Sequence, residues 1–311
     1  LVIMLPVGAA DEVLEKKLTL ALLDKLETAD SSELIPVYIW MKDIDREQIE
    51  TKVYEETGYN MYNIEQDYAV ISEKAMTLDS KSTEFKRLVA EHKELTASAR
   101  MAEKAATEIY TEAERRYTRE AYSKYNYSNV KNLGINDSRV SFSSQYTPMV
   151  IANLTPEQIR SIANSKTTDM LDLVVERQAV EQSLSSMAGT VKAHVIRDSL
   201  GYDGDGVTIG QIETSTNSVH SINVRNIMES VAPNAFYEVR AASNITSFYS
   251  SVESLITAGC SIINCSLSFP EDEQGTRTNW YTNEEKWVDH IEGPHGISFV
   301  VAAGNYGRAS G

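Results

Sequence analysis

Glu213, His220 and Asn305 are the side chains of this sequence whose types and order best suit acid–base chemistry. Glu213 ends an apolar segment typical of a strand, and His220 opens the helical segment that follows. Because about two to six residues usually join a strand to the next helix, the two side chains can meet. In such a pair the carboxylate fixes the imidazole tautomer and stabilises its cation, so the other ring nitrogen can take a proton from a hydroxyl group.

Asn305 follows a small-residue turn after a later apolar strand, where its side-chain N–H can donate to a developing oxyanion. Spacing alone favours a simpler interpretation, in which these three residues cap helices or contact solvent in loops. The glycines of 204–210 do not predict a dinucleotide site, because they precede and enter a strand, whereas that fingerprint follows a strand and opens a helix.

Composition and charge narrow the class of protein. The 311 residues are 42% hydrophobic, which predicts an ordinary globular chain of about two domains. A net charge of −16 repels phosphate backbones, so nucleic acid is not expected as a partner. No Cys/His spacing resembles a zinc site, so the sequence identifies no cofactor. Cys260 and Cys265 are predicted to be buried free thiols, because an extended segment holds their Cα atoms too far apart for a disulfide.

The N-terminal residues 1–10 are apolar and end in small side chains, which predicts the remnant of a secretory signal peptide. A buried strand or short helix is the alternative. Neither this segment nor any later one is long and apolar enough to cross a bilayer. We therefore expect a secreted or extracellular protein with no transmembrane segment in this chain.

Residues 11–176 show the strand and helix pattern of a small α+β domain. Alternating and amphipathic segments predict the order β-α-β-β-α-β, which is the ferredoxin-like split βαβ arrangement. An insertion at about 60–137 repeats apolar residues every three or four positions, so we expect a long helix or a helical hairpin. His92 falls on this seam and is predicted to be a packed helix residue, not a ligand.

Residues 177–311 change in composition, and apolar strands alternate with helices. This alternation predicts a parallel sheet covered on both faces, hence part of a three-layer α/β domain. Ligands of such sheets bind beyond the carboxyl ends of the strands. Glu213, His220 and Asn305 all fall at those ends.

Four segments of this second region carry recognisable motifs, at 201–214, 230–235, 262–268 and 300–307. They resemble segments of the subtilisin-like serine peptidases. They correspond in order to the segment of the triad acid, the Gly-Val-Ala-Pro turn, the substrate-lining strand and the Ala-Ala-Gly-Asn-x-Gly oxyanion strand. The preceding α+β region is similar to the subtilisin propeptide, an intramolecular chaperone and inhibitor.

The resemblance implies a serine-type endopeptidase acting on proteins or peptides, with its own propeptide as inhibitor. Glu213 stands where the family has its triad Asp, His220 where it has the triad His, and Asn305 where it has the oxyanion Asn. Calcium is a cofactor that the resemblance allows, with no site assigned. The strand expected to pair with substrate backbone contains Ser266, Leu267 and Ser268.

Three departures from the family pattern leave two main hypotheses. Glu213 is one methylene longer than Asp, the histidine motif is reduced to His220-Ser221-Ile222-Asn223, and no Gly-Thr-Ser-Met-like segment occurs. We expect the N-terminal part of an exported zymogen whose nucleophilic serine lies beyond this chain. The alternative is a catalytically degenerate subtilase that serves as an extracellular binding or scaffold module. A free-standing inhibitor built on the propeptide fold is a third, weaker hypothesis.

Overall fold

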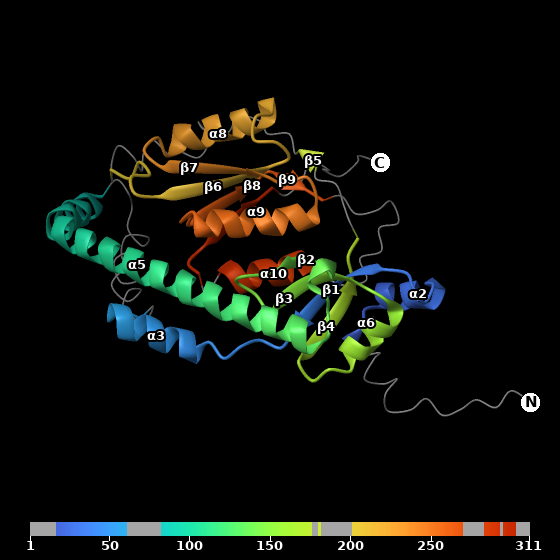
Figure 1. The fold of residues 1–311 in the computed structure, drawn as a ribbon. Coiled ribbons are helices and arrows are strands. Elements are labelled where there is room, and N and C mark those ends of the chain that lie inside the picture. Colours follow the sequence, from blue (N-terminus) through green and yellow to red (C-terminus); the bar gives the residue numbers. More distant parts are fainter. Residues whose placement is uncertain are drawn as a thin grey trace, which may run out of the picture.

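The computed structural model describes residues 17–60, 82–175, 180–181, 201–269, 283–292 and 295–302. These residues form a mixed α/β fold with one antiparallel and one parallel four-stranded sheet, and a short two-stranded sheet (Figure 1). The predicted signal remnant lies outside the described residues. So does most of the chain around the predicted boundary between 176 and 177.

The antiparallel sheet has the strand order β2-β3-β1-β4. Successive side chains of a strand point to opposite faces, and both faces of β1 are buried. Val37 and Ile39 belong to one apolar cluster, whereas Tyr38 and Trp40 belong to another. The strands are β1 (Ile35–Met41), β2 (Val140–Ser143), β3 (Met149–Leu154) and β4 (Thr168–Leu173).

Helices α2 (Leu20–Thr28) and α6 (Pro156–Ala163) contribute apolar side chains to the cluster on one face of this sheet. The first turn of α6 is fixed by its sequence. The Thr155 hydroxyl accepts the Gln158 backbone N–H at 3.3 Å, and the Gln158 side chain accepts the Thr155 N–H at 3.1 Å. The backbone N–H that proline lacks would have no intrahelical partner at the first helical position, so Pro156 costs the helix no hydrogen bond.

The long insertion forms a single described helix, α5 (Thr83–Asn132), and residues 61–81 before it lie outside the described residues. The side chain of His92 is also outside the description. Helix α3 (Glu47–Thr57) packs against α5 through a small cluster that includes Ile49, Val53 and Tyr110. The helix expected after the first strand therefore contacts the insertion helix, whereas α2 supplies buried leucines to the sheet cluster.

The parallel sheet has the strand order β10-β8-β6-β7, and helices α8 and α9 lie on opposite faces of it (Figure 1). Gly210 allows α9 to approach closely, because a Cβ there would lie 2.8 Å from Leu255 Cδ1. The strands are β6 (Thr208–Glu213), β7 (Phe236–Ala241), β8 (Ile262–Cys265) and β10 (Ser298–Val301). The helices are α8 (Val219–Val231), α9 (Ile245–Thr257) and α10 (Asn283–Glu292).

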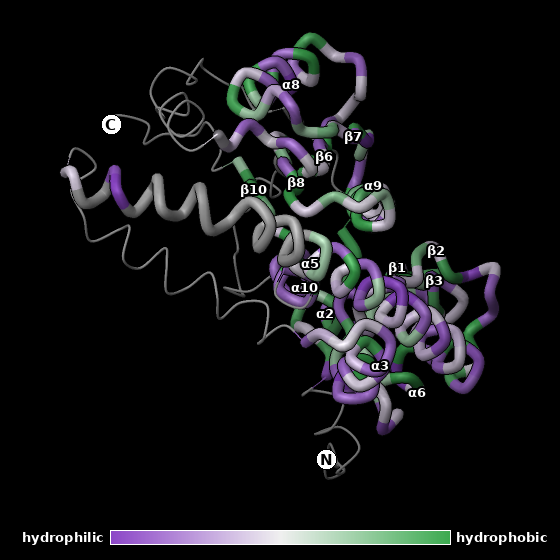
Figure 2. Tube along the Cα trace, turned by 90° about the vertical axis from the view of Figure 1, so that its left-hand side faces the viewer, coloured by the Kyte–Doolittle hydropathy of each residue, from purple (hydrophilic) through white to green (hydrophobic). Residues whose placement is uncertain are grey.

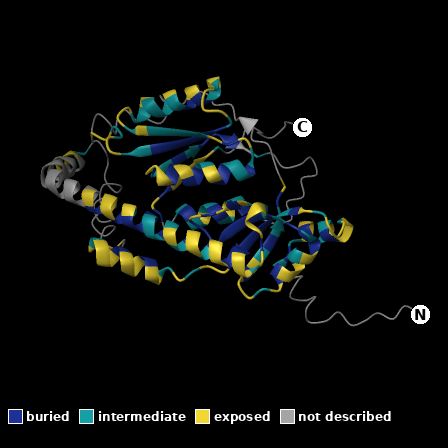
Figure 3. Ribbon diagram, viewed as in Figure 1, coloured by how far each residue is buried: buried dark blue, intermediate teal, exposed yellow. Residues whose placement is uncertain are grey.

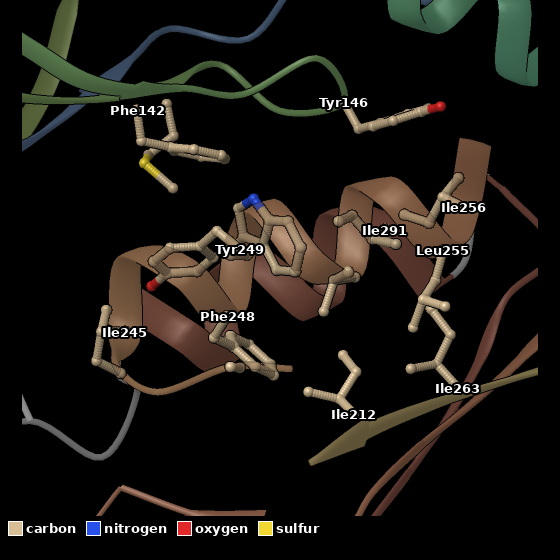
Figure 4. Packing of buried hydrophobic residues seen from close by; sticks show 14 of the residues in the cluster. Phe142, Tyr146, Ile212, Ile245, Phe248, Tyr249, Leu255, Ile256, Ile263 and Ile291 are labelled. Carbon is tan, nitrogen blue, oxygen red and sulfur yellow. The ribbon is translucent and has the colours of Figure 1, made fainter. Parts of the chain in front are cut away.

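A continuous aromatic core joins the two sheets. Figure 4 shows Tyr249 and Phe248 of α9 below Phe142 of β2, and the ring centroids of Phe142 and Tyr249 are 5.6 Å apart. The ring of Trp287 in α10 meets Tyr249 edge-on at 4.9 Å. In Figure 2 hydrophobic residues are prominent around β2, β3 and β8. Figure 3 shows β1 and β3 as mostly buried, whereas β7 is largely intermediate and α3 mostly exposed. The second face of the antiparallel sheet is therefore covered by α9 and α10.

A buried carboxyl on α9 binds the loop between β2 and β3. The Ser144 hydroxyl donates to Glu253 at 2.5 Å, and the Gln145 backbone N–H donates at 3.2 Å. Burial raises the pKa of the Glu253 carboxyl to about 7, against the opposing effect of these hydrogen bonds. The contact therefore holds a titratable group at the boundary between the two sheets.

Helix α5 reaches the parallel sheet through two consecutive buried residues. Glu114 accepts from His295 Nδ1 at 2.9 Å, while Arg115 Nη2 donates to the backbone carbonyl of Cys260 at 2.9 Å. The charge of His295 and its hydrogen bond lower the pKa of the Glu114 carboxyl, although burial alone would raise it. The insertion helix thus belongs to the packed interior at this point.

We predict that Tyr249→Ala lowers the free energy of unfolding by about 3–5 kcal/mol, the usual cost of truncating a buried aromatic ring. Tyr249 is 0% exposed, and on α9 it contacts rings of β1 and α10, so the whole protein should still unfold in one cooperative transition, at lower urea. Urea unfolding followed by fluorescence and circular dichroism measures this. Tyr54→Ala, at a position 54% exposed, is the control and should change little. Two separate transitions in the wild type would contradict a shared core.

We predict that Glu253 makes stability fall as pH rises. With a pKa of about 7 in the folded protein and an ordinary value of 4.5, its contribution is complete below about pH 4.5 and is lost by about pH 7. This shift corresponds to about 3 kcal/mol. Glu253→Gln, which resembles the protonated form, should remove this part of the pH dependence in urea unfolding compared at acidic and alkaline pH. An unchanged difference between the two pH values would contradict the assignment.

Candidate active site

Glu213 is the last residue of β6, and its side chain is completely buried. β6 lies between β7 and β8, so Glu213 sits at the carboxyl edge of the sheet, with a strand on either side. The side-chain amide of Gln211 donates to Glu213 Oε1 at 3.0 Å. A buried carboxylate needs such donors, because transfer from water into a protein interior strongly disfavours an uncompensated charge.

His220 is the second residue of α8, within the first turn of the helix. Ser218 caps this helix by accepting the Ser221 N–H at 3.0 Å, which fixes the first turn. His220 Nε2 lies 3.3 Å from Glu213 Oε2, and the imidazole is 12% exposed while the carboxylate is 0% exposed. The expected contact between the two side chains is therefore present, with a buried acid behind a partly accessible ring.

Gln211 is a member of this site that the sequence analysis missed. It is fully buried, and its Nε2 also donates to the Ser221 carbonyl at 2.9 Å. Strand alternation was the signal that could have found it, because residues two apart on a strand share a face. A polar side chain two positions before Glu213 in an otherwise apolar strand must share its buried surroundings.

Ser266, Leu267 and Ser268 follow β8 directly. Ser266 is buried, and its hydroxyl accepts from Asn264 Nδ2 at 2.9 Å. Leu267–Ser268 forms β9, which pairs antiparallel with β5 (Val180–Glu181). The side chain of Ser268 lies outside the description. The segment predicted to pair with substrate backbone thus already pairs with an extended segment of the same chain.

Asn305 lies outside the described residues, so its expected position near His220 remains a prediction. β10 ends at Val301 and pairs parallel with β8, whose last residue, Cys265, neighbours Ile212 of β6. The strand that precedes Asn305 therefore runs in the same direction as β6, with its carboxyl end at the same edge of the sheet.

Both cysteines are free and buried among the described residues, as expected. Burial raises the pKa of the Cys260 and Cys265 thiols to about 11, and the negative charge of Glu213 adds to the effect at Cys265. A thiol with so high a pKa is almost wholly protonated at neutral pH, so neither residue is a competent nucleophile.

Two hollows described on the surface lie away from the Glu213–His220 pair. The larger, about 890 Å³, runs between α5 and the amino ends of β6 and β8, where Thr208 and Ser261 line it. The other, about 580 Å³, lies between α3 and α5. Both are lined in part by the insertion helix.

Comparison with known protein families and with curated protein sequences gives no match. Among the described residues, no group of three or more His, Cys, Asp or Glu side chains is arranged to hold a metal ion. The helices in the described part of the chain include none long and apolar enough to span a membrane.

We predict that Cys260 and Cys265 resist a thiol reagent in the native protein and both react once it is unfolded, because only the thiolate attacks. Colour release from an aromatic disulfide reagent at neutral pH measures this, with and without concentrated guanidinium. Rapid labelling of either residue in the folded chain would contradict the burial described here.

Proposed function

We propose that this chain is the N-terminal part of a secreted subtilisin-like serine endopeptidase zymogen, with Glu213 and His220 as the acid–base pair of its triad. The observation that carries the proposal is the 3.3 Å contact between a fully buried carboxylate and a partly exposed imidazole at the carboxyl edge of a parallel sheet. A buried acid that orients a partly exposed imidazole supplies two of the three members of a Ser-His-acid triad, here with the acid at Nε2 of the ring.

In the proposed reaction, His220 removes the proton of a serine hydroxyl that a later part of the protein supplies. The serine oxygen attacks the peptide carbonyl carbon, and Glu213 stabilises the imidazolium that results. Nε2 is the ring nitrogen that faces Glu213, so Nδ1 is the nitrogen that accepts the proton. Asn305 donates to the oxyanion, and the C–N bond breaks as the imidazolium gives its proton to the leaving amine. Water, deprotonated by the same imidazole, then attacks the acyl-enzyme and releases the serine.

The arrangement of the two sheets supports the proposal at the level of the fold. Helices on opposite faces of a parallel sheet are consistent with a three-layer subtilisin-like domain (Figure 1). The strand order β2-β3-β1-β4, with α6 between β3 and β4, is consistent with a ferredoxin-like propeptide at about 11–176. The insertion at 60–137 then extends this propeptide.

The pairing of β5 with β9 supports a peptide substrate and inhibition by the chain's own propeptide. Val180 lies opposite Ser268, and Glu181 lies opposite Leu267, in an antiparallel register. Addition of an extended peptide to an open strand is a common mode of peptide recognition, because backbone hydrogen bonds bind any sequence. On this proposal, β5, which lies just beyond the end of the propeptide at about 176, occupies the substrate strand until the chain is cleaved and this segment leaves.

A binding or scaffold module is the second candidate function. The observation in its favour is the hollow of about 890 Å³ along α5, lined by Arg116, Arg119 and Tyr202 and distant from the acid–base pair. A fluorophosphonate probe applied to the full-length protein separates the two candidates. Covalent labelling of a serine supports the peptidase, whereas its absence from folded, propeptide-free protein supports the scaffold.

We predict that His220→Ala abolishes propeptide release in the full-length protein, because the serine loses its general base. Mass spectrometry of the expressed protein over time measures the cleavage. Asn226→Ala, an exposed position on the same helix, is the matched control and should be processed like the wild type. Normal processing of a folded His220→Ala protein would rule out the proposed base.

A further inference from the structure

We propose that Gln211 is a positioning residue that holds Glu213 and the first turn of α8 in register, so that the longer acid meets His220. Its consequence for catalysis rests on the proposed function, whereas its structural part does not. Gln211 and Glu213 are two positions apart on the central strand β6, and both are 0% exposed. Their side chains therefore share one buried face.

A single amide group contacts both Glu213 and Ser221, the residue next to His220. Gln211 Nε2 lies 3.0 Å from Glu213 Oε1, 2.9 Å from the Ser221 carbonyl and 3.3 Å from the Ser221 hydroxyl. Ser221 immediately follows His220, so the amide links the carboxylate to the peptide next to the imidazole. Displacement of strand or helix would stretch at least one of these bonds.

The orientation of the amide is determined by its surroundings. Two of the three atoms around Nε2, the carboxylate oxygen and the carbonyl oxygen, can only accept a hydrogen bond. The Ser221 hydroxyl donates to the Thr216 carbonyl at 3.3 Å, which leaves its lone pairs towards Gln211. The reverse orientation would face the amide oxygen with acceptors, so Gln211 acts here as a donor.

Glutamate at position 213 explains why a donor is useful there. Glu has one more rotatable bond than Asp, and a buried carboxylate on it has more orientations to lose. Gln211 binds Oε1 and leaves Oε2 for His220 Nε2. Removal of the amide would leave a buried carboxylate oxygen without this donor. The carboxylate would then rotate towards a different hydrogen-bond donor.

Gln211→Met tests the proposal on this chain, since methionine nearly matches glutamine in shape and has no N–H. We expect the ring N–H proton of His220, observed by NMR in histidine-labelled protein, to exchange with water about tenfold faster. The reason is that Glu213 loses the charge-assisted hydrogen bond from Gln211 that holds its carboxylate towards the ring. His220→Gln assigns the signal. Asn264→Leu is the matched control, because Asn264 is the register partner of Gln211 but bonds to Ser266.

Repeating the measurement in a Glu213→Gln protein tests whether the effect of Gln211→Met acts through the carboxylate. In Glu213→Gln protein, the same Gln211→Met change should alter the exchange rate less than twofold, because no charge remains to be held. Equal effects in both backgrounds, or an equal effect of Asn264→Leu, would overturn the proposal. If the Gln211→Met protein does not fold, the exchange rate of the Gln211 side-chain N–H protons in the wild type tests the proposal instead. Slow exchange supports the assigned hydrogen bonds, and exchange as fast as that of an exposed amide contradicts them.

Activity of the full-length protein separates this inference from the proposed function. Gln211→Met should lower kcat about tenfold and leave KM nearly unchanged, since its donor acts through the acid–base pair and not on substrate. If the protein is active and Gln211→Met leaves kcat unchanged, only the positioning role is refuted. A protein that forms no acyl-enzyme but shows the predicted exchange change refutes the peptidase alone.

Discussion

The fold depends on the burial of both faces of one antiparallel sheet. β1 carries Val37 and Ile39 towards α2 and α6, and Tyr38 and Trp40 towards α9 and α10. Such a sheet cannot leave either face in water without exposing large apolar side chains, at a cost of about 25 cal/mol for each Å². The parallel sheet is therefore held against the antiparallel sheet through α9 and α10, whose side chains share this core.

Polar side chains fix the orientation of the two sheets within this apolar contact. Trp40 donates its indole N–H to Asn283 at 2.7 Å, and Asn283 donates in turn to Asp172 at 2.7 Å. Buried groups of this kind are costly unless they are paired, so they permit few alternative alignments. Glu253 adds a bond to the β2–β3 loop whose strength follows the protonation of one carboxyl.

Much of this arrangement was predictable from local sequence patterns. The strands of both sheets and the contact of Glu213 with His220 follow from apolar runs and from the short connection between β6 and α8. The packing of α3 on α5 was not predictable, because amphipathic periodicity shows that a helix has an apolar face but not what covers it. Gln211 was missed for a related reason. Its significance comes from Ser221 on another element, and only the folded chain brings the two together.

Arg115 gives the insertion helix a structural consequence of its own. The last carbonyls of a helix have no intrahelical donor and carry the negative end of its dipole. At the carboxyl end of α9, the guanidinium of Arg115 from α5 donates to the backbone carbonyls of Cys260 and Ile256. The terminus of a helix in one half of the molecule is thus completed by a segment encoded some 140 positions earlier. A shortened chain without that segment would lose this donor to the Cys260 carbonyl, whereas the Ile256 carbonyl would keep the Gly259 backbone N–H.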